Sequence, residues 1–248
     1  MSCARNVISL SLIHILLFAA SLLFFQLLFS DSGLTVNAKL LFQDDGSQPE
    51  GGAAPTSVSR SDWNLILVNP SSPLPEVYDV TLTQLKNGHA VDERCYPDLQ
   101  DMMDDCRAAG LSPVICSSYR TQETQQALYD AKVESFLAQG YSSQDAAQQA
   151  GQVVALPGTS EHQLGLALDI VDLQYQSLDE AQEQTNVQQW LAENSWKYGF
   201  ILRYPKEKSD LTGIVYEPWH YRYVGKDSAR EIYEQNICLE EYLALIDP

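Results

Sequence analysis

Two histidines and two carboxylates in the C-terminal half of the chain have the residue types of a hydrolytic metal site. His162 and Asp169 lie in the segment SEHQLGLALDI, and Glu217 and His220 lie three residues apart in YEPWHYRYVG. Two histidines and one aspartate can bind zinc and leave one coordination position open for water. A nearby carboxylate that is not a ligand, here Glu217, could then act as the general base.

Asp169 needs such a partner because its surroundings are apolar. If residues 165–170 form a strand, side chains alternate between its faces, so Asp169 shares one face with Gly165 and Ala167. The larger apolar residues take the opposite, core-packed face. A buried carboxylate without a partner is costly, and a bound metal would neutralise it. From these residues alone, a zinc site and a pair of satisfied core histidines both remain open.

The other two histidines are not expected at this site. His14 lies in an apolar run near the N-terminus, and His89 lies in the turn-like segment KNGHAVD, where we expect it to be exposed to solvent.

Short strands and several helices are expected to position these side chains. Strand patterns cover residues 63–69, 113–120, 165–170 and 217–225, and helical patterns cover residues 98–109, 121–139, 142–155, 186–199 and 227–237. Thr121 is the predicted N-cap of the second helix, and Gly140 follows its end. Few strands interspersed with helices indicate an α+β fold with a small, mostly antiparallel sheet flanked by helices.

The N-terminus predicts a membrane anchor. Residues 7–29 contain no charged side chain, and about 20 apolar residues span a bilayer core. Arg5 precedes this run, which favours a cytoplasmic N-terminus. We therefore expect one transmembrane helix within residues 1–30, a flexible linker at 31–59 and a folded domain at 60–248. The expected localisation is the cell membrane, single-pass, with the domain on the outer face; a cleaved secretory signal is the alternative.

Composition limits the partners. The chain has 33 acidic and 15 basic residues and a net charge of -18, which argues against nucleic acid as a partner. We expect a monomer. Four cysteines lie in the predicted outer domain: Cys95, Cys106, Cys116 and Cys238. They allow three disulfide pairings, among which the sequence does not choose, and Cys116 could instead be a buried free thiol.

Three segments of the chain resemble a known family. SSYRTQETQ, PGTSEHQLGLALDIVD and YEPWHYRYVG are similar to the signature segments of the VanY-type D-alanyl-D-alanine carboxypeptidases. These are zinc metallopeptidases related to the VanX-type D,D-dipeptidases, with a hedgehog-like fold. Their pattern S-x-H-x-x-G-x-A-x-D, followed by E-x-W-H, is matched at every position, and the resemblance covers roughly residues 63–245.

The resemblance implies a role for each candidate residue. His162, Asp169 and His220 would bind Zn²⁺, and Glu217 would be the general base and then the proton donor to the leaving D-alanine. Arg120 would bind substrate and stabilise developing negative charge, for which its planar fork is suited. Three further residues fall where the family places substrate contacts: Ser118, Gln125 and Ser160.

The implied function is hydrolysis of the C-terminal D-alanine from peptidoglycan stem peptides by a membrane-anchored carboxypeptidase, which could contribute to glycopeptide resistance. An L,D-carboxypeptidase, an endopeptidase acting on cross-links and a catalytically silent wall-binding module remain alternatives, and activity on D-Ala-D-lactate stays open. A serine carboxypeptidase of the penicillin-binding class is excluded, because no lysine has a serine three residues before it.

Overall fold

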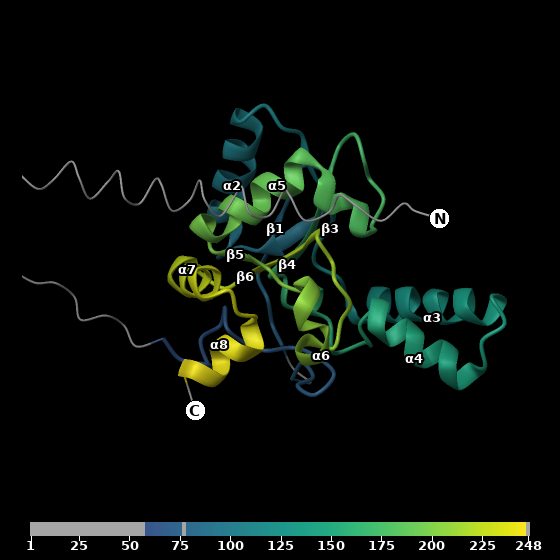
Figure 1. Ribbon diagram of the computed structural model, residues 1–248. Helices are drawn as coiled ribbons and strands as arrows, with labels where there is room; N and C mark the ends of the chain where they lie inside the picture. The colour runs from purple at the N-terminus through teal and green to yellow at the C-terminus, as the bar shows by residue number, and fades with distance from the viewer. Residues whose placement is uncertain (1–57, 76–77, 247–248) are drawn as a thin grey trace, which may run out of the picture. The chain divides into compact units, whose positions relative to one another are not determined.

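A four-stranded antiparallel sheet forms the centre of the described chain. The computed structural model describes residues 58–75 and 78–246, which belong to one unit, Thr56–Pro248. The strand order is β3-β4-β6-β5 (Figure 1), with bounds β3 Pro113–Ser117, β4 Ala167–Asp172, β6 His220–Tyr223 and β5 Phe200–Leu202. A separate hairpin pairs β1 Leu82–Gln84 with β2 Ala90–Asp92, also antiparallel. This arrangement confirms an α+β fold with small antiparallel sheets.

The apolar face of β4 packs in the main core. Leu166, Leu168 and Ile170 are fully buried there, as their alternation with Asp169 predicted. Two helices supply much of the remaining core, α2 Tyr96–Ala108 and α5 Asn186–Asn194. Burial of one such aliphatic side chain contributes about 1.5–3 kcal/mol. The opposite face of β4 is therefore the one that is free to carry polar side chains.

Two helices form a hairpin that projects from the sheet (Figure 1). They are α3 Gln122–Ala138 and α4 Ser143–Val153, and they pack against each other. Thr121 Oγ1 accepts a hydrogen bond from the backbone N–H of Thr124 at 3.2 Å, so the predicted N-cap is confirmed. Gly140 follows the helix with a φ of +94°, a conformation that glycine adopts without strain.

The remaining helices include two that pack near β5 and several short ones. α7 Lys226–Gln235 and α8 Leu239–Ile246 share a second apolar cluster with Leu65 and Ile201. The shorter elements are α6 Ser209–Thr212 and the 3-10 turns η1 Glu161–Leu164, η2 Glu180–Gln184, η3 Ser195–Tyr198 and η4 Lys206–Lys208. The sequence predicted α7 but not α8.

The strand predicted at residues 63–69 is wrong. This segment is a series of turns and extended residues, with only an isolated bridge between Asn69 and Ser72. Arg222 Nη2 donates to the carbonyls of Asn64 and Ile66, at 3.1 and 2.9 Å. A buried guanidinium thus donates to carbonyls that would pair with a neighbouring strand if the segment lay in a sheet. An apolar run in the sequence does not show whether a strand or a side chain satisfies its carbonyls.

The predicted localisation, a single-pass membrane protein, is corrected by the helices of the described chain. Within residues 58–75 and 78–246, no helix is both long and apolar enough to cross a bilayer. α3, the longest of them, has 17 residues and many polar side chains, whereas a span needs about 20 mostly apolar residues. The apolar run at 7–29, the predicted anchor at 1–30 and the predicted linker up to residue 57 lie outside the described residues.

The four cysteines considered for disulfides are all free, three of them buried and Cys116 exposed.

Candidate active site

Strand pairing brings Asp169 and His220 together. In the antiparallel pair of β4 and β6, Asp169 lies directly opposite His220, and its Oδ1 is 3.1 Å from His220 Nδ1. Asp169 also pairs with Ser117 of the neighbouring strand β3. Asp169 and His220 are each 3% exposed. The sheet therefore holds a carboxylate and an imidazole in contact on the face of β4 that lies opposite its apolar residues.

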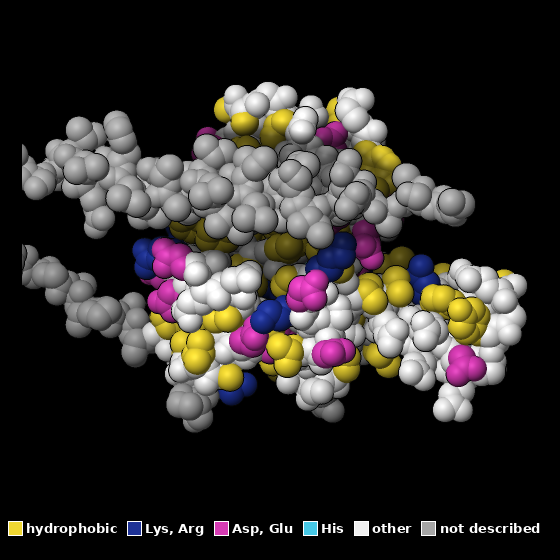
Figure 2. Space-filling view, viewed as in Figure 1, with side chains coloured by type: hydrophobic (Ala, Val, Ile, Leu, Met, Phe, Trp, Pro, Cys, Tyr) yellow, Lys and Arg dark blue, Asp and Glu magenta, His cyan; other side chains and the backbone are white. Residues whose placement is uncertain are grey.

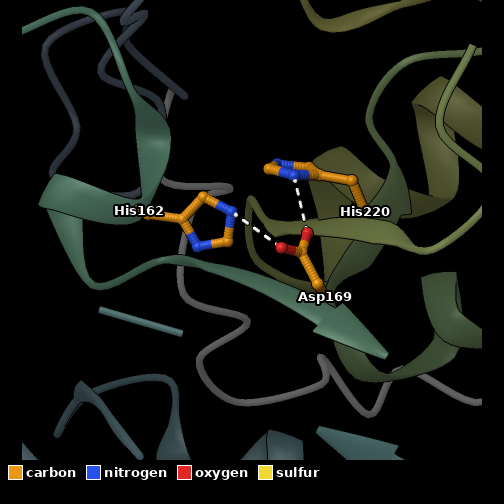
Figure 3. Close-up of side chains that lie close together, drawn as sticks. All are labelled: His162, Asp169 and His220. Atoms are coloured by element: carbon orange, nitrogen blue, oxygen red, sulfur yellow. Dashed lines mark hydrogen bonds and ion pairs between the residues drawn. The ribbon is translucent and has the colours of Figure 1, made fainter. Parts of the chain in front are cut away.

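His162 reaches the same point from η1, the 3-10 turn that precedes β4. Its Nδ1 lies 2.8 Å from the carbonyl oxygen of Ser118, which can only accept a hydrogen bond, so Nδ1 carries the proton. The other ring nitrogen, Nε2, lies 3.4 Å from Asp169 Oδ2 (Figure 3). The lone pair of Nε2 is thus directed at the carboxylate.

Gly165 allows the chain to turn from η1 into β4. Its φ is +74°, in the left-handed region. A Cβ at this position would lie 3.0 Å from the backbone nitrogen of Asp92 and 3.3 Å from the side chains of Leu82 and Val80. The turn that places His162 over Asp169 therefore needs a residue without a side chain.

The three side chains fit a zinc ion. One ligand atom from each of His162, Asp169 and His220 lies within 4.8 Å of the others, and all three residues are buried. Zinc binds imidazole nitrogen and carboxylate oxygen at about 2 Å, so small rotations of the side chains would place one ion between them. Three protein ligands also leave a position for water or substrate. The donor set is that of a catalytic rather than a structural zinc site.

Burial and mutual contact shift the pKa values of all three residues. Burial, followed by the charge of Arg120, lowers the pKa of His162 to about 4, so this imidazole is neutral, as a ligand must be. Burial alone would lower the pKa of His220, but the neighbouring carboxylates of Asp169 and Glu161 raise it to about 9. Burial would raise the pKa of Asp169, yet the two histidines hold it well below its ordinary value.

Glu217 lies beside this cluster without belonging to it. A turn connects it to the strand, since the backbone N–H of His220 donates to its carbonyl at 3.2 Å. Its Oε2 is 3.6 Å from His220 Nδ1, and the residue is 8% exposed. Burial raises the pKa of Glu217 to about 8; Asp169 raises it further, whereas His220 and Arg120 oppose the shift. The structure thus places a buried carboxyl group beside the cluster of His162, Asp169 and His220.

Arg120 is held in a fixed orientation next to Asp169. Its Nη2 lies 3.0 Å from Asp169 Oδ2, and Nε and Nη2 both donate to Ser117 Oγ, at 3.0 and 2.7 Å. Its Nη1 donates to Gln125 Oε1 at 3.2 Å, while Gln125 Nε2 donates to the carbonyl of Ala155. Gln125 is fully buried and acts on the cavity through Arg120.

Most of the predicted site residues line one cavity. Its volume is about 260 Å³, and six of the eight predicted residues line it: Arg120, Ser160, His162, Asp169, Glu217 and His220. Ser118 and Gln125 are not among its lining residues. A larger cavity of about 470 Å³ lies beside α2 and β3 and includes none of the eight. We assign the site to the smaller cavity because the chemical groups converge there.

Ser118 lies behind His162 rather than at the cavity wall. Its Oγ accepts a hydrogen bond from the backbone N–H of Ala90 at 3.1 Å and lies 3.1 Å from His89 Nδ1. His89, expected to face solvent, is half-buried against this hydroxyl, so that expectation is wrong. As substrate contacts, Ser118, Gln125 and Ser160 stay predictions.

Two residues near the cluster were missed from the sequence. The ring of Tyr204 lies 4.7 Å from that of His220, and Glu161 lies 3.6 Å from His220 on its other side. Glu161 belongs to a segment already singled out, but an acid next to a histidine in a short motif does not reveal which way it points.

Comparisons with known proteins show the family of this chain. The family model described as VanY, D-alanyl-D-alanine carboxypeptidase, matches residues 88–226. The chain is 49% identical over 199 residues to a D-alanyl-D-alanine carboxypeptidase of Enterococcus faecalis, covering 79% of this chain and 72% of that relative. Two solved structures are also similar. VanYB in complex with D-alanine-D-alanine is 51% identical, with a TM-score of 0.69, over 74% of this chain and 98% of that one. A zinc-bound mutant of the vancomycin resistance D,D-pentapeptidase VanY is 51% identical, with a TM-score of 0.68, over 73% and 99%.

Proposed function

Because this chain belongs to the VanY family of zinc-dependent D-alanyl-D-alanine carboxypeptidases, we propose that it removes the C-terminal D-alanine from peptidoglycan stem peptides. One observation carries the proposal. The cavity that holds the cluster of His162, Asp169 and His220 also contains Glu217 and Arg120, a proton acceptor and a fixed cation. We assign the peptidase domain to residues 60–248.

His162, Asp169 and His220 would hold the zinc ion, which, when bound, acts as a Lewis acid that polarises the peptide carbonyl and activates water. Glu217 would accept a proton from the attacking water. It would then donate that proton to the amino group of the departing D-alanine, as the carbon–nitrogen bond breaks. Glu217 suits both proton transfers because it is buried at the cavity and lies 3.6 Å from Nδ1 of His220, a proposed zinc ligand.

Arg120 would stabilise negative charge on the substrate. Four of its five N–H groups bond Ser117, Asp169 and Gln125, so the remaining N–H of Nη1 would donate to a carboxylate or to a tetrahedral oxyanion of the substrate. Ser117, Gln125 and Asp169 already fix the orientation of this side chain, so little reorganisation is needed when substrate binds. Ser160, which lines the same cavity, would offer its hydroxyl to the peptide.

The entrance of the cavity suits an extended peptide. Four exposed apolar side chains line it: Leu128, Val153, Leu178 and Val215. Figure 2 shows hydrophobic side chains exposed along the α3–α4 hairpin. Lys132, half-buried on α3, lines the same cavity and has no ion pair or hydrogen bond with the described residues. We propose that Lys132 pairs with a carboxylate of the stem peptide upstream of the cleaved bond.

A role in glycopeptide resistance is part of the same proposal. One of the similar structures is that of a vancomycin resistance D,D-pentapeptidase. Cleavage by this chain would lower the number of D-alanyl-D-alanine ends in the cell wall.

Mass spectrometry of muropeptides tests the proposal. The purified, zinc-loaded chain should shorten pentapeptide stems by one alanine and leave tetrapeptide stems and cross-linked dimers intact. Preferential cleavage of tetrapeptides would indicate an L,D-carboxypeptidase, and loss of dimers an endopeptidase. No cleavage of any of the three would favour a wall-binding module.

A further inference from the structure

A buried ionic network lies behind the metal cluster. Glu161 is 1% exposed, and Arg203 and Arg222 are fully buried. Both arginines donate to the same oxygen of Glu161: Arg203 Nε to Oε1 at 2.7 Å, and Arg222 Nη1 to Oε1 at 2.8 Å. Arg203 also forms a two-fold pair with Glu240, at 2.9 and 2.7 Å. One oxygen of Glu161 is therefore fully engaged.

The second oxygen of Glu161 faces His220. Oε2 lies 3.6 Å from His220 Nε2, and both atoms are buried without a hydrogen-bond partner among the described residues. Unpaired buried polar atoms are costly, and an imidazole N–H and a carboxylate oxygen satisfy each other. A shift of a few tenths of an ångström would close this pair.

The geometry points to Glu161 as a positioning residue for His220. We propose that its Oε2 accepts a hydrogen bond from His220 Nε2–H, so that the lone pair of Nδ1 is directed at the metal position beside Asp169. This inference rests on the proposed function, which makes His220 a zinc ligand. Histidine ligands commonly donate their second N–H to such a partner, which fixes the ring and its tautomer.

The two histidines would thus be oriented in different ways. His162 donates Nδ1–H to a neutral carbonyl, that of Ser118, and presents Nε2 to the metal. His220 would donate Nε2–H to a carboxylate and present Nδ1. The carboxylate partner makes the second imidazole the more strongly donating ligand.

The arginines explain how a carboxylate stays ionised at this depth. Burial would raise the pKa of Glu161, but the charges of Arg203 and Arg222 hold it below its ordinary value. Arg222 is fixed in turn by the carbonyls of Asn64 and Ile66. The position of Glu161 is therefore set by β6, by the residue after β5 and, through Arg222, by residues 64–66.

Two charge-removing variants separate positioning from general stability. Glu161→Gln changes the group that faces His220, whereas Glu240→Gln removes a charge from the same network without contacting His220. Zinc affinity, measured by competition with a chelator, should fall about 10–100-fold in Glu161→Gln. In Glu240→Gln it should change less than about twofold, even if the melting temperature falls. Equal zinc affinity in Glu161→Gln and wild type, or equal losses in both variants, would overturn the proposal.

A measurement on the wild-type chain covers the case in which Glu161→Gln does not fold. Nitrogen-15 NMR of the zinc-loaded protein should show His220 protonated at Nε2, with a proton that exchanges slowly with solvent. Protonation at Nδ1 instead would overturn the inference. Neither contrary result would by itself contradict the proposed function. That function would fail only if the wild-type chain bound no zinc or cleaved no stem peptide.

Discussion

Asp169 and His220 stand directly opposite each other in the antiparallel pair of β4 and β6, with Asp169 Oδ1 3.1 Å from His220 Nδ1. Opposite residues in such a pair have Cβ atoms about 4.5–5.5 Å apart, close enough for both side chains to bind one ion. Two of the three proposed ligands are thus placed by strand register. Only His162 depends on a turn, so the geometry of the site is most sensitive to η1.

The contrast between a ligand and the base should appear in zinc content. Glu217→Gln should retain one zinc per chain while losing at least about 10²–10⁴-fold in kcat, the contribution of a positioned general base. His220→Ala should lose both zinc and activity. Metal analysis of the two purified variants, together with turnover of a pentapeptide, makes the comparison. Loss of zinc in Glu217→Gln would show that Glu217 is a ligand.

Arg120→Lys tests whether the site needs the several donors of the guanidinium group or only its positive charge. Lysine can still neutralise Asp169, but it cannot keep the bonds to Ser117 and Gln125 and at the same time donate to a substrate oxyanion. The variant should fold and bind zinc normally, and kcat/KM should fall about 10²-fold or more. Turnover close to that of the wild type would instead make Arg120 a structural partner of Asp169.

The turn at Gly165 should respond to a single methyl group. Gly165→Ala combines an unfavourable φ with a Cβ 3.0 Å from the Asp92 nitrogen, whereas Gly88→Ala has a similar φ of +84° and open space around its Cβ. The backbone cost alone is about 1–2 kcal/mol. Denaturant titration should show a larger loss of stability for Gly165→Ala, and only this variant should bind zinc more weakly. Equal losses in the two variants would contradict the role given to the close contact.

Lys132 should affect binding of substrate rather than the chemical step. Lys132→Ala should raise KM about two- to tenfold for a stem peptide with a free upstream carboxylate and leave kcat nearly unchanged. Amidation of that carboxylate should raise KM for the wild type and not for the variant. Lys86→Ala, which removes a lysine that lines the other cavity, serves as the control. A wild type that does not distinguish the two peptides would remove Lys132 from the substrate site.

Local patterns predicted more of this molecule than long-range contacts did. The alternation around Asp169 identified its face of β4, and the cap at Thr121 identified the start of α3, because both depend on neighbours in sequence. The sequence did not predict which hydrogen-bond partners these polar groups have. The side chain of Ser118 turns toward His89, and the carbonyls of the predicted strand at 63–69 accept from Arg222, a residue more than 150 positions away.

The network around Glu161 shows the same limit. Its two arginines come from β6 and from the residue after β5, and nothing in SEHQ indicates that they converge on one oxygen. Residue types and the resemblance to a family both pointed to the proposed ligands, whereas the register of β4 and β6 explains why Asp169 and His220 meet.

The central claim is that hydrolysis depends on zinc held by His162, Asp169 and His220. The most direct test removes the metal by dialysis against a chelator and then titrates zinc back while release of D-alanine from a pentapeptide is measured. Activity should be lost on removal and should return in proportion to bound zinc, reaching its maximum at one ion per chain. Full release of D-alanine by the metal-free protein would contradict the account.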